Sequence, residues 1–168
     1  MSNHLYILGF MGSGKTTLFE KWSSTFEGTC YDFDHELARI SGIEPDQLGE
    51  WIKRKGWEEF RKRERELLLQ SLDRKEGLYA LGGGTFSAEN AQIFQKYPLA
   101  KTLWVQTPVE LCWERVKEDS NRPLVKAGKD EFISLYKERE KLYKLANYRI
   151  SGDREFPSRE EFWKNYVI

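Results

Sequence analysis

The sequence contains few cysteines, and they are badly placed for a metal site or a disulfide framework. The 168 residues include two of them, Cys30 and Cys112, which lie far apart and have no metal-ligand spacing with His4 or His35. Zinc motifs need clustered Cys and His ligands, and disulfides persist mainly in oxidising compartments. We therefore expect two reduced, buried thiols.

An excess of charge of one sign is also absent. Lysine and arginine together number 27, and so do aspartate and glutamate, which gives a net charge of zero. Nucleic acids and membrane surfaces attract proteins largely through an excess of basic residues. The balance argues against either as the main partner, although it leaves room for a local basic site that binds a small anion.

Long apolar runs are missing as well. No run approaches the roughly 20 apolar residues that span a bilayer. Met1 leads into the first apolar stretch without the basic and hydrophobic regions of a signal peptide, so we predict a cytoplasmic protein. With 39% hydrophobic and 32% charged residues the composition is globular, and we predict a single domain over residues 1–168.

The most informative stretch runs from Gly9 to Thr16 and has the form G-x-x-x-x-G-K-T. It follows the apolar run 5–8 and leads into a helical pattern, which is the context of a phosphate-binding P-loop. Glycines let backbone N–H groups wrap a polyphosphate, and the helix N-terminus adds free donors. A chance glycine-rich turn is the alternative, which the flanking elements disfavour. Lys15 would reach the β- and γ-phosphates and the Thr16 hydroxyl would bind Mg²⁺. The predicted ATP-binding residues here are Gly12, Ser13, Gly14, Lys15, Thr16 and Thr17.

Five apolar segments alternate with helical patterns along the chain. We predict strands at residues 5–8, 29–33, 78–81, 101–105 and 148–151, and helices at 17–26, 36–40, 45–56, 57–72, 87–97, 108–117, 130–145 and from 159 onward. This alternation predicts an α/β fold of three layers, with helices on both faces of a five-stranded parallel sheet. Ligands of such folds bind beyond the carboxyl ends of the strands. Those ends carry the P-loop, Asp32 with Asp34, and residues 82–84.

Two of the helix starts have sequence signatures. Thr107, Pro108 and Glu110 are of the types expected at the N-cap and at the first and third helical positions. Ser158 and Glu161 form a capping box that should open the last helix.

Asp32 and Asp34 end the second predicted strand, where alternation would place both carboxylates on the same side. One carboxylate near Mg²⁺ and another near an acceptor hydroxyl would suit phosphoryl transfer. Alternatively, Asp34 caps the helix predicted at 36–40. The residues alone leave both interpretations open.

Three arginines could gather around an anionic acceptor. Arg61 lies on a long charged helix, Arg122 in a polar interruption at 118–129, and Arg139 on the next helix. Each alone is typical of a solvated surface. Together with Lys15 they would suit an acceptor that has its own carboxylate, because guanidinium binds carboxylate bidentately. In a nucleotide kinase-like chain, the 118–129 segment would be a lid over the phosphates.

These motifs together resemble the shikimate kinase family of P-loop, nucleoside monophosphate kinase-like proteins. The resemblance covers nearly the whole chain, in the family's order and at close to its spacing. It is carried by the P-loop, Asp32-x-Asp34, Phe60-Arg61 with Glu64, Gly82-Gly83-Gly84, Arg122-Pro123-Leu124 and Arg139-x-x-Leu142-Tyr143.

The resemblance implies transfer of the ATP γ-phosphoryl group to the 3-hydroxyl of shikimate with Mg²⁺, in aromatic amino acid biosynthesis. It implies catalytic roles for Lys15, Asp34 and Arg122, and a metal role for Asp32 through water. Adenine would contact Arg115 and Pro157. The implied shikimate-binding residues are Asp34, Arg61, Gly82, Gly83, Gly84 and Arg139.

The same resemblance implies a regional organisation of the single domain. A helical acceptor-binding region would occupy about residues 34–62, and the lid about 118–129. We expect a monomer that binds the small molecules shikimate and ATP and has no nucleic-acid or membrane partner.

Three positions depart from the family pattern. Trp57 stands where an acid is usual, Arg63 where an apolar residue is more frequent, and Thr85 where a small apolar residue is common. None is a substrate or catalytic position. For the tryptophans on predicted helices and strands we expect core packing, namely for Trp51, Trp57, Trp104 and Trp113.

Other functions would require other features. A gluconate kinase or a nucleoside monophosphate kinase would use the same fold and lid, so a panel of acceptors separates these from the first hypothesis. A GTPase-like switch would need an N-K-x-D or T-K-x-D motif, and the sequence contains neither. Residues 46–49 match D-x-x-G but fall inside a predicted helix.

Overall fold

The computed structural model describes residues 4–119 and 122–166, and a parallel sheet of five strands forms its centre. The strand order is β2-β3-β1-β4-β5, and all four neighbouring pairs are parallel. Each strand begins and ends within one residue of its predicted bounds, so the predicted sheet is confirmed. The strands are β1 (His4–Leu8), β2 (Thr29–Asp32), β3 (Gly77–Ala80), β4 (Ala100–Gln106) and β5 (Tyr148–Ser151).

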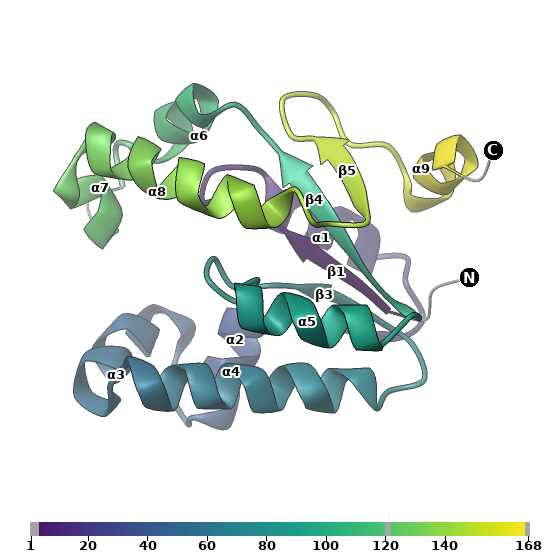
Figure 1. Ribbon diagram of the computed structural model, residues 1–168, viewed down its shortest axis with the longest axis horizontal. Helices are drawn as coiled ribbons and strands as arrows, with labels where there is room; N and C mark the ends of the chain where they lie inside the picture. The colour runs from purple at the N-terminus through teal and green to yellow at the C-terminus, as the bar shows by residue number, and fades with distance from the viewer. Residues whose placement is uncertain (1–3, 120–121, 167–168) are drawn as a thin grey trace.

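Helices connect the strands and cover both faces of the sheet (Figure 1). A 3-10 turn, η1 (Pro45–Gln47), precedes α3 and shortens the helix predicted at 45–56. The helices are α1 (Lys15–Ser23), α2 (Phe33–Ile40), α3 (Leu48–Lys55), α4 (Trp57–Leu72), α5 (Ala88–Lys96), α6 (Val109–Val116), α7 (Pro123–Ala127), α8 (Lys129–Tyr143) and α9 (Arg159–Tyr166).

Two hydrophobic clusters fill the two faces of the sheet. Successive side chains of a strand point to opposite faces, so Tyr6 and Leu8 join one cluster while Leu5 and Ile7 join the other. The first cluster includes residues of α2, α4, α5 and α8, and the second those of α1 and α9. Figure 1 shows α5 and α8 in front of the sheet and α1 behind it. The three-layer α/β/α prediction is therefore confirmed.

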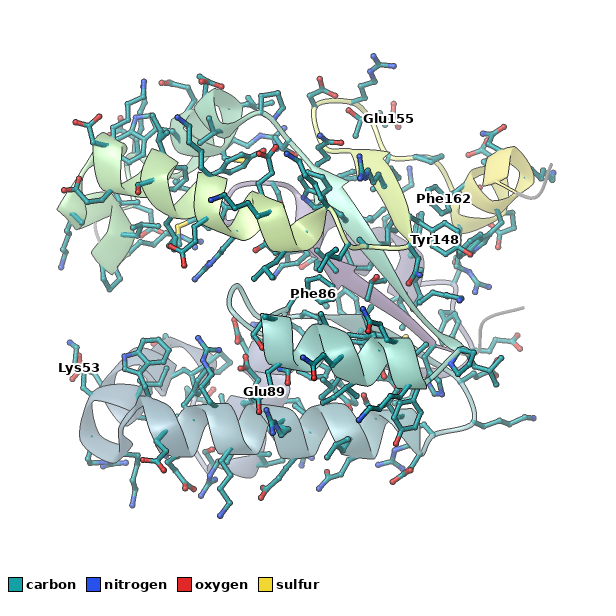
Figure 2. The ribbon with its side chains drawn as sticks, viewed as in Figure 1. Lys53, Phe86, Glu89, Tyr148, Glu155 and Phe162 are labelled. Atoms are coloured by element: carbon teal, nitrogen blue, oxygen red, sulfur yellow. The ribbon has the colours of Figure 1, made fainter. Side chains whose placement is uncertain are left out.

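The last helix begins as its capping box predicts. The Ser158 N–H donates to Glu161 Oε2 at 2.7 Å, and the Glu161 N–H donates to Ser158 Oγ at 3.2 Å. Tyr148 of β5 and Phe162 of α9 then pack edge to face, with ring centroids 6.4 Å apart (Figure 2). The local cap and this aromatic contact together dock the C-terminal helix on the edge strand.

The second strand is shorter, and the helix after it longer, than predicted. β2 ends at Asp32 because the carboxylate of that residue accepts the N–H groups of Asp34 and His35 and caps α2. The predicted helix start at residue 36 was therefore wrong. Both positions predicted for Asp34, at the end of the strand and at the helix cap, were wrong as well. That residue is neither in the strand nor at the cap, and it lies in the first turn of α2.

The N-cap predicted at Thr107 was also wrong. The helix α6 begins at Val109 after Pro108, whereas the Thr107 hydroxyl donates to the carbonyl of Ser13 at 2.8 Å. Further along, α7 lies within the polar segment predicted at 118–129, of which residues 120–121 lie outside the described residues. The helix α8 starts one residue earlier and ends two residues earlier than the predicted 130–145.

Most of the aromatic and thiol expectations hold, with two exceptions. Trp51 and Trp104 are buried as expected, whereas Trp57 is 61% exposed, so core packing was wrong for it. Cys112 is buried, but Cys30 is only half-buried. No helix within the described ranges has the length and apolarity to cross a membrane.

Candidate active site

The P-loop is delivered by a fully buried strand. After β1 ends at Leu8, the chain turns through Gly12 and Gly14 with φ of 79° and 94°, a left-handed conformation that glycine adopts at little cost. The helix α1 begins immediately afterwards, at Lys15. The N–H groups of its first turn have no partners inside the helix and remain available for an anion.

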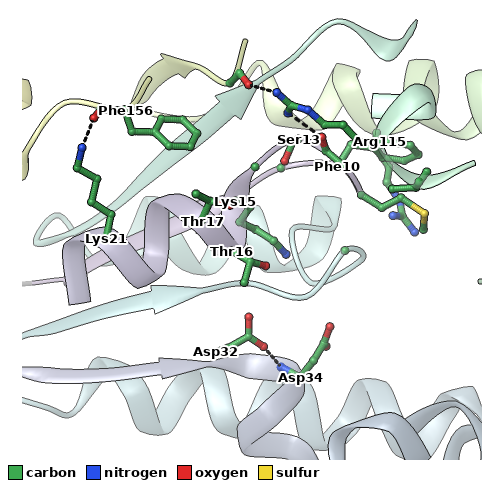
Figure 3. Close-up of a pocket in the computed structure, with 18 of the residues that line it drawn as sticks. Phe10, Ser13, Lys15, Thr16, Thr17, Lys21, Asp32, Asp34, Arg115 and Phe156 are labelled. Atoms are coloured by element: carbon green, nitrogen blue, oxygen red, sulfur yellow. Dashed lines mark hydrogen bonds between the residues drawn. The ribbon is translucent and has the colours of Figure 1, made fainter. Parts of the chain in front are cut away.

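A cavity of about 1010 Å³ opens over this loop (Figure 3). Besides the P-loop, segments from six other parts of the fold reach it, including the ends of β2 and β3 and the loop after β5. Twelve of the residues predicted for the site line the cavity: Gly12, Ser13, Gly14, Lys15, Thr16, Thr17, Asp32, Asp34, Gly83, Arg115, Arg122 and Arg139. The structure thus brings the P-loop and the two aspartates together, as strand-end topology predicts.

Lys15 connects the P-loop with the loop that follows β3. Its Nζ donates to the carbonyl of Leu81, the last residue before the three glycines. In Figure 3, the side chains of Lys15 and Thr16 project across the cavity toward Asp32 and Asp34. The cation therefore stands between the nucleotide loop and the carboxylates, where it can contact a transferring phosphoryl group.

The Asp34 carboxyl has a pKa raised above its ordinary value of 3.8. Burial is the largest cause, the Lys15 ammonium acts in the opposite direction, and the negative charges of Asp32 and Glu64 raise the pKa further. A carboxylate with a raised pKa accepts a proton more readily than an ordinary one. Its environment therefore suits the activation of a hydroxyl.

The loop at residues 82–84 consists of glycines, and three charged side chains lie directly against its backbone. A Cβ built on the first glycine would lie 2.5 Å from Asp34 Oδ1, and one on the second 3.1 Å from Arg139 Nη1. One on the third would lie 2.5 Å from Arg61 Nη2. A side chain at any of these positions would press on one of these groups, and glycine lets them approach the backbone this closely. The loop thereby gathers side chains from α2, α4 and α8.

Arg61 is held on several sides. Its Nη1 lies 2.6 Å from Glu64 Oε2, and the buried Glu64 also accepts the hydroxyl of Thr85. The guanidinium carbon lies 5.2 Å from the ring centroids of both Trp57 and Phe60, within the range of cation–π attraction. Two of the departures from the family pattern thus contact this arginine or its carboxylate partner.

Arg63, the third departure, ties three helices together. From α4, its Nε lies 2.9 Å from Glu59 Oε1 and its Nη1 donates to Ser41 Oγ, at the end of α2, at 3.2 Å. Its guanidinium carbon also lies 5.0 Å from the ring centroid of Trp51 on α3. An apolar side chain could not make these polar contacts, so the arginine has a structural role in this region.

Arg115 joins the P-loop to the loop after β5. From α6, its Nη1 donates to the Gly12 carbonyl at 3.0 Å and its Nη2 donates to the Gly152 carbonyl at 2.9 Å. Figure 3 shows the guanidinium spanning the two segments. Both hydrogen bonds lie in the guanidinium plane, so they fix its orientation and leave its flat face for stacking.

Arg122 lines the cavity from the N-terminus of α7. Its Nε lies 2.8 Å from Asp119 Oδ2, and both side chains are more than 40% exposed. Exposed ion pairs of this kind contribute only about 0–1 kcal/mol. Exchanging Asp119 for a phosphate oxygen would therefore cost Arg122 little.

Four predicted residues do not line the cavity: Arg61, Gly82, Gly84 and Pro157. The first three adjoin it through their contacts at residues 82–84. Pro157 accepts the Trp22 indole N–H at its carbonyl, at 3.0 Å.

Sequence reasoning missed several lining residues, among them Lys21, His35, Arg154, Glu155 and Phe156. Lys21 donates to the Phe156 carbonyl, and a Cβ on Gly14 would lie 3.1 Å from the Phe156 ring. A charged residue on α1 and an aromatic one beside Pro157 have no distinctive spacing. Only the folded contact between the P-loop and the loop after β5 identifies them.

The residues present fit a magnesium ion that arrives with a nucleotide. Within the described part of the chain, no cluster of three His, Cys, Asp or Glu side chains could hold a metal alone. Thr16 and Asp32 both line the cavity, and the N–H donors of α2 engage only Oδ1 of Asp32. Mg²⁺ commonly keeps several waters and binds substrate phosphates with few protein ligands. One hydroxyl and one carboxylate are consistent with that mode.

Comparison with known proteins shows the family of the chain. A shikimate kinase family model matches residues 11–166. The chain belongs to the shikimate kinase family. A shikimate kinase of Aquifex aeolicus is 33% identical over 150 residues, which cover 89% of this chain and 87% of that protein.

The fold of the chain is also similar to solved structures over nearly its whole length. The crystal structure of the shikimate kinase from Aquifex aeolicus has a TM-score of 0.78 and 31% identity, over 98% of this chain and 94% of that one. A shikimate kinase from Acinetobacter baumannii in complex with shikimate has a TM-score of 0.76 and 30% identity, over 98% and 90%. Members of the family are kinases, and this chain has the P-loop and the cavity that ATP-dependent phosphoryl transfer requires.

Proposed function

We propose that this chain transfers the γ-phosphoryl group of ATP to the 3-hydroxyl of shikimate, which gives shikimate 3-phosphate and ADP. The observation that carries the proposal is the approach of Asp34, Arg61 and Arg139 to residues 82–84, beside the P-loop cavity. Shikimate combines a carboxylate with hydroxyls. Two guanidinium groups suit the carboxylate, and a carboxylate of raised pKa suits a hydroxyl.

On the donor side, backbone N–H groups at residues 12–17 would bind the triphosphate. Lys15 and Arg122 would neutralise the charge that develops on the transferring group. Thr16 would bind Mg²⁺ directly and Asp32 through water, and the ion would shield the phosphate oxygens from one another. The protein contributes positioning and electrostatic stabilisation, because phosphoryl transfer needs little covalent chemistry from the enzyme.

On the acceptor side, Arg61 and Arg139 would fix the carboxylate while backbone N–H groups of residues 82–84 contact the ring substituents. Asp34 would orient the 3-hydroxyl and accept its proton. Holding the hydroxyl in line with the γ-phosphorus makes the reaction effectively unimolecular.

On the adenine side, the flat face of Arg115 would stack on the base, with its edge already held by two carbonyls. Pro157 would contact the opposite face of adenine. The adjoining Phe156, which lines the cavity, would close the site behind the P-loop.

The regional organisation belongs to the same proposal. Residues 34–62 would form the acceptor-binding region and 118–129 the lid, whose closure excludes water and limits ATP hydrolysis. We propose a cytoplasmic monomer. The net charge of zero argues against nucleic-acid and membrane partners.

A coupled assay of ADP release with a panel of acceptors tests the proposal. Shikimate should be phosphorylated with MgATP, whereas gluconate and nucleoside monophosphates should give rates near the background hydrolysis of ATP. Turnover of one of the other acceptors, with none of shikimate by folded protein, would refute it.

A further inference from the structure

Thr107 belongs to no part of the predicted site, yet it contacts the P-loop directly. The residue is 1% exposed, and its hydroxyl donates to the Ser13 carbonyl at 2.8 Å. The contact arises because β1 and β4 are neighbouring parallel strands whose carboxyl ends lie at the same edge of the sheet. Thr107 is the first residue after β4, and Ser13 lies in the loop after β1.

Neighbouring groups hold this hydrogen bond in place. The Tyr136 hydroxyl of α8 donates to the Thr107 carbonyl at 2.7 Å. From the other side, Gly152 packs so closely that a Cβ on it would clash with both the Thr107 hydroxyl and the Ser13 carbonyl. The Gly152 N–H in turn donates to the Gln106 carbonyl at 2.8 Å. The threonine is thus fixed by the strand before it, by α8 and by the loop after β5.

The hydrogen bond determines how one peptide unit of the P-loop is turned. In a planar trans peptide the C=O and the N–H point in opposite directions. When the Ser13 carbonyl points to Thr107, the N–H of Gly14 must point away from it, and Gly14 lines the cavity. Gly14 also has the left-handed conformation, with φ of 94°, that occurs in anion-binding nests. Arg115 holds the preceding peptide in the same way, through the Gly12 carbonyl.

We propose that Thr107 is a positioning residue for nucleotide binding. Its hydroxyl sets the orientation of the peptide between Ser13 and Gly14, and so presents the N–H of Gly14 to the triphosphate. The proposal rests on the proposed function only in taking MgATP as the ligand. It does not depend on which acceptor the enzyme phosphorylates.

The test compares two substitutions that differ in the hydroxyl. Thr107→Val keeps the shape of the side chain but removes the donor, whereas Thr107→Ser keeps the donor. Calorimetric titration of the 168-residue chain with MgADP, and with a non-hydrolysable MgATP analogue, should show affinity about tenfold weaker for Thr107→Val. That factor corresponds to the loss of one buried hydrogen bond. Thr107→Ser should stay within about threefold of the unchanged protein.

Steady-state kinetics add a readout that a merely structural role would not change. The KM for ATP should rise in Thr107→Val by a factor similar to the loss of affinity, while the KM for shikimate stays within about twofold. General loosening of the fold would affect both substrates alike.

Thr102, which lies within β4, provides a matched control. It is also 1% exposed, and its hydroxyl lies 3.1 Å from Asn147 Oδ1 and contacts that residue instead of the P-loop. Thr102→Val therefore removes a comparable buried hydroxyl and should lower the Tm without changing nucleotide affinity.

Three outcomes would overturn the proposal. They are unchanged nucleotide affinity in Thr107→Val, an equal loss in Thr102→Val, or a tenfold loss in a folded Thr107→Ser. The last keeps the proposal falsifiable if Thr107→Val does not fold. The predicted affinities together with no phosphorylation of shikimate would instead refute the proposed function and leave the role of Thr107 intact.

Discussion

Arg61 and Arg139 both approach the glycine loop, residues 82–84, but their surroundings differ. Arg61 is paired with Glu64, a carboxylate that is 1% exposed, and it is flanked by two aromatic rings. Arg139 lies against Gly83, and its guanidinium carbon is 5.6 Å from the ring centroid of Phe10. Truncating Arg61 leaves a buried carboxylate with fewer partners, which is costly. Among the described residues no carboxylate forms a salt bridge with Arg139, so its truncation leaves no such group there.

Arg61→Ala and Arg139→Ala should each raise the KM for shikimate roughly 10- to 100-fold, since each removes a charge-assisted hydrogen bond to the carboxylate. The KM for ATP should change less than about twofold. Initial rates over both substrate concentrations measure this, and thermal unfolding should show the larger loss of Tm for Arg61→Ala. Arg65→Ala is the control, because that arginine also lies on α4 but pairs with Glu89. Unchanged acceptor kinetics in both test variants would contradict the proposal that these two arginines bind the carboxylate of shikimate.

Asp34 illustrates a conflict between stability and activity. Its raised pKa means that, between pH 3.8 and the raised value, the folded chain holds a proton that the unfolded chain has lost. Stability therefore falls as the pH rises through this window, and the cost remains at neutral pH.

Asp34→Asn should raise the Tm at pH 7, by about 2 to 4 °C for each kcal/mol of that cost. The gain should vanish below pH 3.8, where the carboxyl is protonated in both states. Turnover should fall roughly 10²- to 10⁴-fold if the carboxylate accepts the proton. Calorimetry of the nucleotide-free protein from pH 3 to 8 and kcat measurements check both effects. A lower Tm at neutral pH would show that ionised Asp34 stabilises the fold.

For helices and strands, short-range hydrogen bonds set where a helix begins. Long-range contacts decide which side chains are available to cap it. The capping box at Ser158 acts within four residues, and α9 begins where it predicts. Asp32 and Thr107 are both good capping residues by type. Asp32 caps a helix, whereas the hydroxyl of Thr107 is used by a loop 94 residues earlier.

The proposed lid connects two helices that contact different parts of the candidate active site. The helix α6 carries Arg115 on the P-loop, and α8 carries Arg139 on the glycine loop. The intervening α7 is five residues long, has no buried residue, and places Arg122 at its start. A short helix with little buried surface should open locally at low cost.

Hydrogen exchange should therefore slow by roughly tenfold or more in peptides from 118–129 when shikimate and a non-hydrolysable MgATP analogue are both bound. Mass spectrometry with and without ligands measures this, and the peptide covering α5 serves as an unchanged reference. Equal protection of 118–129 in the free and bound states would contradict closure of this segment.

At the scale of the whole molecule, the cavity joins segments from most of the chain, so ligands should stabilise the fold as a unit. Binding to the folded state alone adds about 2.7 kcal/mol at a ligand concentration 100 times the Kd. For a chain of this size that corresponds to roughly 5 to 11 °C in Tm.

MgADP and shikimate should each raise the Tm in this way, and Lys15→Ala should largely lose the response to MgADP while keeping the response to shikimate. Differential scanning fluorimetry over a range of ligand concentrations measures both. Loss of both responses in a folded Lys15→Ala would mean that Lys15 organises the whole site rather than the donor half.

Features that depend on a local pattern could be predicted from the sequence. Apolar periodicity located the strands to within one residue, and the P-loop and capping box followed from spacings of a few residues. The resemblance to the shikimate kinases adds Asp34, Arg122 and Arg139, which the cavity brings together. Local periodicity and fixed motifs suffice for these because helix, strand and turn geometry repeat over short distances.

The folded chain was needed to show which hydrogen-bonding groups from distant segments become partners. It turned the Thr107 hydroxyl to the Ser13 carbonyl of the P-loop, and it set the Arg115 guanidinium against the carbonyls of Gly12 and Gly152. A side-chain donor can bind any one of several acceptors. The packing of parallel strands and their loops decides which acceptor lies within hydrogen-bonding distance. That packing joins residues far apart in the chain, so no local spacing in the sequence encodes it.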